Sequence, residues 1–210
     1  MNLKIGIPGY KVGENSFGVG IGYLEWITDW LQSSPIILTP HFRNYDIDLL
    51  VLPGGLDIRN NEIPSFHSQN TDVWKQYFID NDLDLYIEKE IPVFGICAGF
   101  QALCQKYGCK LTQHIYHEAK DGEHHLYVKD GKRNLTKFGK DKVSSSHHQG
   151  VLENGFNYSD LQALFYAEDA VIEAFRHRTL NIAGVQYHPE KIYDTETNNI
   201  IKSILKICVD

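Results

Sequence analysis

Apolar residues follow two alternating patterns along the first half of the chain. Short continuous apolar runs are typical of strands that are buried on both faces of a parallel sheet. Longer stretches with apolar residues at helical spacing separate these runs. The predicted strands cover residues 3–7, 35–39, 49–52 and 92–96, and the predicted helices cover residues 22–32, 73–88 and 98–107. This alternation favours an α/β fold.

The second half of the chain has shorter segments that are typical of hairpins. An apolar run at 126–128 leads into the turn dipeptide Asp130-Gly131. Two further apolar runs, at 170–175 and 180–187, are separated by a short polar segment. An amphipathic helix is expected over Thr195–Val209. These patterns predict a single α/β domain with a mixed sheet and a β-rich second half.

Composition and charge exclude several classes of protein. The 210 residues are 42% hydrophobic and 22% charged, as in an ordinary globular chain, and the formal net charge is −7. Binding to nucleic acid without sequence preference needs a basic surface, so we expect no nucleic-acid partner. No apolar run has the length of a membrane span, and Lys4 and Pro8 interrupt the start of the chain. We therefore expect a cytoplasmic protein with no membrane partner.

One of the four cysteines lies where a buried strand is expected to turn sharply into a helix. Gly95-Ile96-Cys97-Ala98-Gly99 has the G-x-nucleophile-x-G form of a nucleophile elbow. Its glycines let strand and helix approach closely, and a helix N-terminus favours the thiolate and offers free N–H groups. The alternative is a structural cysteine between two packing glycines, because free cysteine is commonly buried and inert.

Two further motifs supply what a cysteine nucleophile needs. Pro53-Gly54-Gly55 directly follows the strand at 49–52, and its glycine backbone can donate N–H groups to a carbonyl oxygen. His188-Pro189-Glu190 ends another predicted strand, where residues two apart point the same way, so the Glu190 carboxylate can reach the His188 ring. Cysteine, histidine and glutamate together form a nucleophile, a base and an orienting group.

In this order and at these spacings, the motifs resemble those of the class I glutamine amidotransferase-like superfamily. Its signatures are a P-G-G loop, a G-x-C-x-G-x-Q elbow and a C-terminal H-P-E, which here are Pro53–Gly55, Gly95–Gln101 and His188–Glu190. The resemblance implies that Cys97 is the nucleophile, His188 the acid and base, and Glu190 its orienting group. The implied fold is flavodoxin-like, with one domain over residues 1–210 and three layers around a mixed, mostly parallel sheet.

The same resemblance implies further site residues and a subgroup. The N–H groups of Gly55 and Ala98 would form the oxyanion hole. Val143-Ser144-Ser145-Ser146-His147-His148-Gln149 is similar to the S-x-H-H-Q motif of the γ-glutamyl hydrolase branch, of peptidase C26 type, which includes hydrolases of γ-glutamyl-γ-aminobutyrate. The implied substrate-binding residues are Gly54, Gln101, Ser145, His147, His148 and Gln149. Ala98 and Tyr187 depart from the Arg and Trp that many relatives carry.

The implied reaction is hydrolysis of a small γ-glutamyl amide through a thioester on Cys97, without a cofactor. The leaving amine stays open between γ-aminobutyrate, other amines or amino acids, and a nucleotide-linked phosphoramidate of the kind used in capsule modification. Two other functions also stay open. One is a glutaminase subunit that supplies ammonia to a separate synthase, and the other is a non-catalytic binding module. The assembly is open between a homo-oligomer and a complex with such a synthase.

The ten histidines raise the question of a metal site. Four of them and three acidic residues gather in one segment, namely His114, His117, Glu118, Asp121, Glu123, His124 and His125. The segment has neither H-E-x-x-H nor the Cys/His spacing of a zinc site, so we expect a solvated polar loop and no metal. The G-x-G-x-x-G and G-x-x-x-x-G-K-[ST] nucleotide motifs are absent from the sequence, so no nucleotide cofactor is expected.

Overall fold

The computed structural model describes residues 3–13, 16–59, 71–115, 122–129, 134–191 and 195–209. Within these ranges, nine strands form one sheet. They are β1 (Lys4–Pro8), β4 (Ser34–Leu38), β5 (Leu49–Leu52), β6 (Val93–Ile96), β7 (Glu123–Lys129), β8 (Leu135–Ser144), β9 (Leu161–Tyr166), β10 (Ile172–His177) and β11 (Ile182–Val185). Their order across the sheet is β4-β1-β5-β6-β11-β10-β9-β7-β8.

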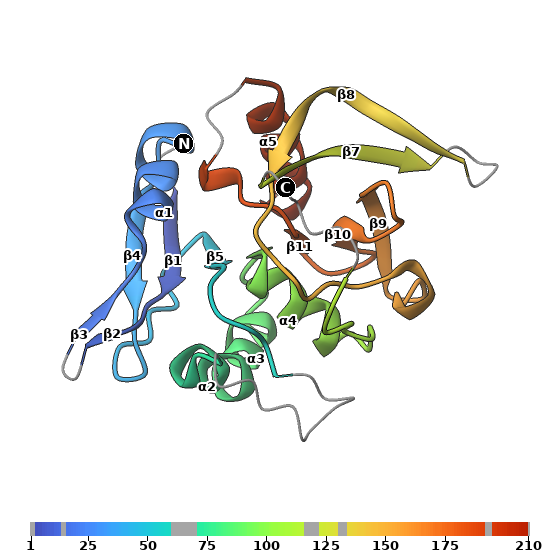
Figure 1. Cartoon of the computed structure of the whole chain (residues 1–210). Helices are drawn as coiled ribbons and strands as arrows, with labels where there is room; N and C mark the ends of the chain where they lie inside the picture. The colour runs from blue at the N-terminus through green and yellow to red at the C-terminus, as the bar shows by residue number, and fades with distance from the viewer. Residues whose placement is uncertain are drawn as a thin grey trace.

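The sheet has a parallel part and an antiparallel part (Figure 1). Strands β4, β1, β5, β6 and β11 are paired in parallel, whereas β10, β9, β7 and β8 continue the sheet antiparallel. Every residue of β5, β6 and β11 is buried, which explains their continuous apolar sequences. The mixed sheet and the β-rich second half that the sequence predicts are therefore confirmed.

Helices cover both faces of the sheet and give the three predicted layers. One face packs against α1 (Ile21–Glu25), the π-helix η1 (Trp26–Trp30) and α5 (Thr195–Val209). The other face packs against α2 (Val73–Asn81), α3 (Leu83–Glu88) and α4 (Ala98–Lys106). Short 3₁₀ helices lie at Glu153–Gly155 (η2) and Pro189–Lys191 (η3). Within the described ranges, none of the helices combines the length and the apolar composition that crossing a membrane requires.

The structure departs from the predicted elements at several places. A second, two-stranded sheet pairs β2 (Tyr10–Gly13) with β3 (Ser16–Gly18), where the sequence predicts no strand. The sequence also predicts no strand at β8 or β9. The helix expected over 73–88 is broken at Asp82, a fully buried residue that pairs with Arg43 from a distant loop. The predicted turn at Asp130-Gly131 lies outside the described residues.

Candidate functional site

The three residues of the predicted triad lie together at the carboxyl edge of the parallel strands. Cys97 follows β6 and His188 follows β11, and these two strands are parallel neighbours. The His188 Nδ1 atom lies 2.7 Å from Glu190 Oε1. The His188 ring and the Cys97 side chain both lie against Gly54. All three side chains are buried. Loops at the carboxyl ends of parallel strands are the usual ligand site of such sheets.

The backbone at Cys97 has the sharp turn that the elbow motif predicts. Cys97 has a φ of 50° and a ψ of −105°, a conformation that side chains rarely adopt and that costs about 1–3 kcal/mol. A Cβ on Gly95 would lie 2.7 Å from backbone atoms of Gly99, and a Cβ on Gly99 would overlap the carbonyl of Leu52. Both glycines are therefore needed for strand and helix to pack this closely. Ala98 begins α4, so its N–H is among those without a partner inside the helix.

His188 is held in a form that carries positive charge at neutral pH. Burial alone would lower the pKa of its imidazole. Hydrogen bonds and charge interactions with Cys97 and Glu190 outweigh burial and raise that pKa to about 9. The site therefore favours an imidazolium that faces the cysteine sulfur, which is the arrangement that an acid in the first step of amide cleavage requires.

The Pro53-Gly54-Gly55 loop packs directly against the triad. A Cβ on Gly54 would lie 2.8 Å from His188 Cε1 and 3.2 Å from Cys97 Cβ, so only a glycine backbone fits there. The Gly54 N–H donates to the Tyr23 hydroxyl at 2.8 Å. Burial, followed by the charges of Glu190 and Cys97, raises the pKa of Tyr23 well above its usual value, so this hydroxyl stays protonated. Tyr23 thus connects the loop to the triad.

A buried lysine holds the same loop from the other side. Lys75, on α2, is only 7% exposed, and its Nζ donates to the carbonyl oxygen of Gly54 at 2.8 Å. Burial lowers the pKa of this lysine to about 8. The C=O and N–H of a trans peptide point in opposite directions, so fixing the Gly54 carbonyl also fixes the direction of the Gly55 N–H. Gly55 has a φ of +142°, which favours glycine.

Several of the predicted substrate-binding residues form a buried hydrogen-bond network. Gln101 Nε2 donates to the carbonyl of Gln149 at 2.8 Å and to Gln186 Oε1 at 3.1 Å. The side-chain amide of Gln149 in turn accepts from the N–H of Ile58 and donates to its carbonyl, both at 3.0 Å. The side chains of Gln101 and Gln149 therefore connect the elbow helix to the segment after the glycine loop.

The remaining residues of the S-x-H-H-Q segment take different positions. Ser145 is buried, and its N–H donates to the carbonyl of Gly122. His148 Nε2 lies 2.8 Å from Asp57 Oδ1, on the segment after the glycine loop, and its ring stacks on that of His114. His147 points away from this group, toward Glu173 on β10. The structure thus separates two adjacent histidines that the sequence places in one pocket.

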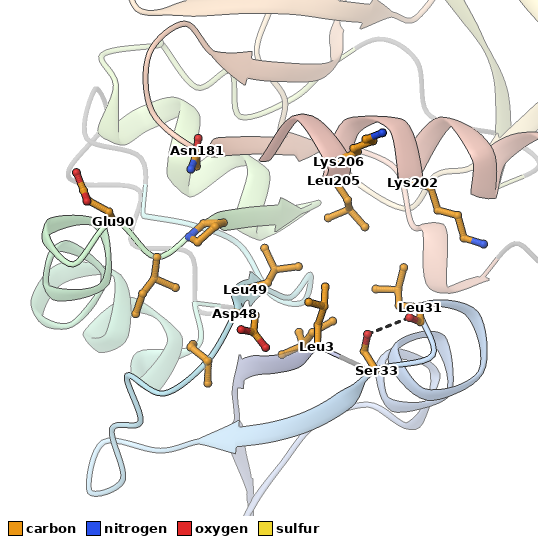
Figure 2. A pocket seen from close by; sticks show the side chains of 14 residues that line it. Leu3, Leu31, Ser33, Asp48, Leu49, Glu90, Asn181, Lys202, Leu205 and Lys206 are labelled. Atoms are coloured by element: carbon orange, nitrogen blue, oxygen red, sulfur yellow. Dashed lines mark hydrogen bonds between the residues drawn. The ribbon is translucent and has the colours of Figure 1, made fainter. Parts of the chain in front are cut away.

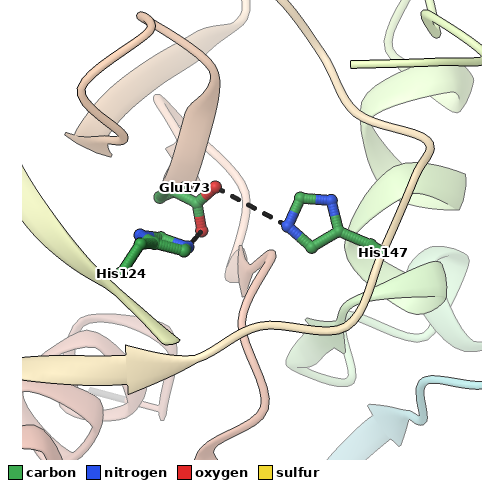
Figure 3. Close-up of side chains that lie close together, drawn as sticks. All are labelled: His124, His147 and Glu173. Carbon is green, nitrogen blue, oxygen red and sulfur yellow. Dashed lines mark ion pairs between the residues drawn. The ribbon is translucent and has the colours of Figure 1, made fainter. Parts of the chain in front are cut away.

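His124, His147 and Glu173 come together on the antiparallel side of the sheet (Figure 3). One nitrogen from each ring and one carboxylate oxygen lie within 4.8 Å of one another. This is the group among the described residues whose donor atoms could hold a metal ion. Of the histidine-rich segment considered above, only His124 contributes to it. His117, Glu118 and Asp121 lie outside the described residues.

A cavity of about 750 Å³ lies far from the triad (Figure 2). It is lined at the amino ends of the parallel strands, by residues such as Leu3 before β1, Leu49 at the start of β5, and Pro92 before β6. The triad lies at the carboxyl ends of the same strands. The cavity and the triad are therefore at opposite edges of the sheet, and the cavity takes no part in the candidate site.

Sequence reasoning missed three residues of these clusters. Tyr23 and Lys75 hold the glycine loop, and Glu173 faces two histidines. Each acts across a long separation in sequence, so no local motif includes it. Glu173 could have been identified from the sequence, because it is a charged residue inside the apolar run at 170–175. A charged side chain in a buried strand is rare unless it has a partner.

Comparison with known proteins identifies relatives of most of the chain. The family model described as "Glutamine amidotransferase class-I" matches residues 27–208. The gamma-glutamyl-CDP-amidate hydrolase of Campylobacter jejuni is 29% identical and is aligned over 77% of this chain and 75% of its own length. A subunit of the glutamine-hydrolyzing GMP synthase of Methanococcus aeolicus is 26% identical, with 79% and 77% aligned. A glutamine amidotransferase structure from Thermotoga maritima superimposes with a TM-score of 0.60 at 17% identity, covering 100% of this chain and 87% of that one.

Proposed function

The chain belongs to the glutamine amidotransferase class-I family, and we propose that it is a cysteine-dependent hydrolase that cleaves a γ-glutamyl amide and releases glutamate and an amine. One observation carries this proposal. The Cys97 side chain lies on a strained elbow beside the ring of His188, which Glu190 orients at 2.7 Å. A nucleophile, a base and an orienting group within hydrogen-bonding reach are the parts that acyl transfer needs.

In the proposed first step, the Cys97 thiolate attacks the side-chain carbonyl carbon of the γ-glutamyl group. The carbonyl oxygen becomes an oxyanion, which the N–H groups of Gly55 and Ala98 stabilise. The His188 imidazolium then gives its proton to the leaving nitrogen as the C–N bond breaks. The products of this step are the free amine and a γ-glutamyl thioester on Cys97.

In the second step, His188 is neutral and accepts a proton from a water molecule that attacks the thioester carbon. The same oxyanion site stabilises the second tetrahedral intermediate. The C–S bond breaks, the thiolate is regenerated beside the imidazolium, and glutamate leaves. Glu190 keeps the His188 ring in one orientation through both steps, since its oxygen accepts the Nδ1–H.

Lys75 and Tyr23 act through the glycine loop in this mechanism. They hold the carbonyl and the N–H of Gly54, and so they fix the peptide whose Gly55 N–H would face the oxyanion. A hydrogen-bond donor that is already oriented does not have to reorganise during the reaction. This preorganisation is the main source of oxyanion stabilisation. We therefore propose both as positioning residues, not as catalytic ones.

The proposed leaving groups include a nucleotide-linked phosphoramidate. The Campylobacter jejuni relative is named as a hydrolase of a γ-glutamyl-CDP-amidate, and the similarity covers three quarters of its length. The S-x-H-H-Q segment, with His148 paired to Asp57 beside the glycine loop, also supports the hydrolase branch. Within this proposal, the glutamyl half would be held near Gly54 and Gln101, and the leaving half would extend outward from the elbow.

The second candidate function is a glutaminase subunit that delivers ammonia to a separate synthase. It is supported by the similarity to the GMP synthase subunit over 77% of that protein's length, which is as extensive as the similarity to the hydrolase. The chemistry at Cys97 would be the same with glutamine as the substrate. The two candidates differ in the amine that leaves and in whether a partner protein is needed.

The test is glutamate release by the purified protein alone. L-Glutamine is compared with a panel of γ-glutamyl amides that includes γ-glutamyl-γ-aminobutyrate and a γ-glutamyl nucleotide phosphoramidate, and Cys97→Ala is the control. Release from a large amide and much slower release from glutamine support the hydrolase. Release from glutamine alone, or only after a synthase is added, supports the glutaminase function. Full turnover by Cys97→Ala would overturn the mechanism for both.

A further inference from the structure

A fully buried carboxylate faces two imidazole rings beside the antiparallel strands. Glu173 on β10 has no exposed surface. His124 Nε2, on β7, lies 3.4 Å from its Oε2, and His147 Nε2, on the loop after β8, lies 3.8 Å from its Oε1 (Figure 3). Each carboxylate oxygen thus faces a different ring, and three segments far apart in the sequence meet at this point.

The backbone fixes the orientation of both rings. His124 Nδ1 lies 3.1 Å from the carbonyl oxygen of His125, and His147 Nδ1 lies 2.9 Å from the carbonyl oxygen of Gln149. A carbonyl only accepts, so each Nδ1 carries the proton in these bonds. In the neutral rings, both Nε2 lone pairs then point toward the carboxylate. Metal-binding histidines have this arrangement, with the second ring nitrogen donating to a carbonyl or carboxylate.

From this geometry, we propose that His124, His147 and Glu173 bind one zinc-type divalent cation. Two imidazoles and a carboxylate are an established donor set for zinc, with bonds of about 2.0–2.2 Å, which puts neighbouring ligand atoms roughly 3.3 Å apart. The two ring nitrogens lie 3.4 and 3.8 Å from different oxygens of the carboxylate, so an ion between the rings would face both oxygens. One ligand atom from each residue lies within 4.8 Å of the others.

A proton is the competing way to balance the charge of Glu173. Burial lowers the pKa of His124, but the Glu173 carboxylate outweighs this and raises that pKa to about 9. An imidazolium would then replace the ion. The two possibilities differ in what added zinc should do. If the site holds an ion, zinc should bind to both rings and the carboxylate, and if it holds a proton, zinc should not bind there.

The cluster touches the elements that hold the triad, but it shares no side chain with it. The carbonyl of Glu173 accepts from the N–H of Gln186, two residues before His188. The carbonyl of Gln149 accepts from both the His147 ring and the Gln101 side chain. The ion would tie β7, β10 and the loop after β8 together, and its fourth coordination position would be open to water. This proposal does not depend on the proposed hydrolase activity.

The test is a titration of chelator-treated protein with zinc by calorimetry. The parent is the Cys97→Ser variant, because a thiol beside His188 is a second place where zinc could bind. We expect one equivalent of zinc to bind, and we expect Glu173→Gln and His124→Gln each to weaken this binding by more than about 100-fold. His125→Gln is the matched control. It changes the next residue on the same strand, whose ring faces Lys137, and should leave zinc binding unchanged.

Three results would overturn the site. These are no zinc binding by the folded parent, equal binding by the parent and by both variants, or sulfur ligands in the X-ray absorption spectrum of the bound zinc. Zinc–sulfur bonds are recognised at about 2.3 Å, against about 2.0–2.2 Å for nitrogen and oxygen. If Glu173→Gln does not fold, the partly exposed His124→Gln variant decides the outcome by itself.

Discussion

Two buried groups of histidine and glutamate lie near one another in this protein, and they differ in how closely their atoms meet. At the carboxyl edge of the parallel strands, His188 Nδ1 and Glu190 Oε1 are 2.7 Å apart and come from residues two apart in sequence. On the antiparallel side, Glu173 faces two rings at 3.4 and 3.8 Å, and its partners are far away in sequence. The distance of 2.7 Å between His188 and Glu190 suits a shared proton. The distances of 3.4 and 3.8 Å around Glu173 leave room for an ion.

This difference shows that residue type alone does not decide the role of a buried pair. Both carboxylates are buried, and each helps to raise the pKa of a histidine to about 9, in the case of His188 together with Cys97. Only the first group includes a candidate nucleophile, Cys97, which also helps to raise the pKa of His188. Measuring turnover and zinc binding in every variant should therefore separate the two groups, because each substitution affects one readout far more than the other.

Glu190→Gln should give the largest effect among these tests. We expect kcat/KM to fall about 10²–10⁴-fold, because a neutral amide no longer stabilises the imidazolium. The folded pKa of His188 is raised, so activity that needs the imidazolium persists below about pH 9 and is lost above it. Without the Glu190 charge, this loss should move to lower pH, whereas zinc binding stays unchanged. The profile of kcat/KM against pH measures the shift, and an unmoved alkaline limb would contradict it.

Gly55→Ala should lower turnover nearly as much without touching the triad. The new Cβ would lie 2.5 Å from Lys75 Nζ, so the end of this lysine has to move away from the loop, and the φ of +142° strains any residue other than glycine. Loss of one oxyanion donor costs about 10²–10³-fold in kcat. Gly18→Ala is the control, since its Cβ meets only ordinary contacts at 3.4 Å or more. Steady-state kinetics on both variants test this, and an unchanged kcat in Gly55→Ala would exclude its N–H as an oxyanion donor.

Lys75→Met should have a smaller effect on the rate and little effect on stability. The change keeps the apolar stem but removes the hydrogen bond to Gly54, so we expect kcat to fall about tenfold as the peptide loses its fixed direction. The variant loses a charge that burial disfavours but leaves the buried Gly54 carbonyl without its donor, so the two effects oppose one another and the melting temperature should change little. The exposed Lys202→Met is the control. A drop in both rate and melting temperature would point to a purely structural lysine.

The elements and residues that could be predicted from the sequence are those specified by local patterns. Strand β6 and the turn at Cys97 lie within one short motif, and the glycines that the turn needs are part of that motif. His188 and Glu190 are likewise close in sequence. The continuous apolar runs of β5 and β11 identify buried parallel strands, because neither face of such a strand tolerates polar side chains.

The features that could not be predicted depend on distant partners. The break between α2 and α3 occurs where Asp82 pairs with Arg43, which helical periodicity does not reveal. Lys75 is buried because the glycine loop offers it a carbonyl, and nothing near residue 75 signals that contact. The S-x-H-H-Q motif identifies His147 and His148 as important, but it does not indicate where their rings point. In the structure, His147 faces Glu173 and His148 faces Asp57.

The smallest expected effect is a change in thermal stability when zinc is added. A ligand at about 100 times its Kd stabilises a folded protein by about 2.7 kcal/mol. For a chain of this size, that corresponds to a rise of roughly 5–10 °C in melting temperature. We expect this rise in the Cys97→Ser parent and in His125→Gln, but not in Glu173→Gln or His124→Gln. A rise in all four variants would place zinc elsewhere, and a rise in none would leave a proton as the partner of Glu173, so that both groups of histidine and glutamate would be proton-bound.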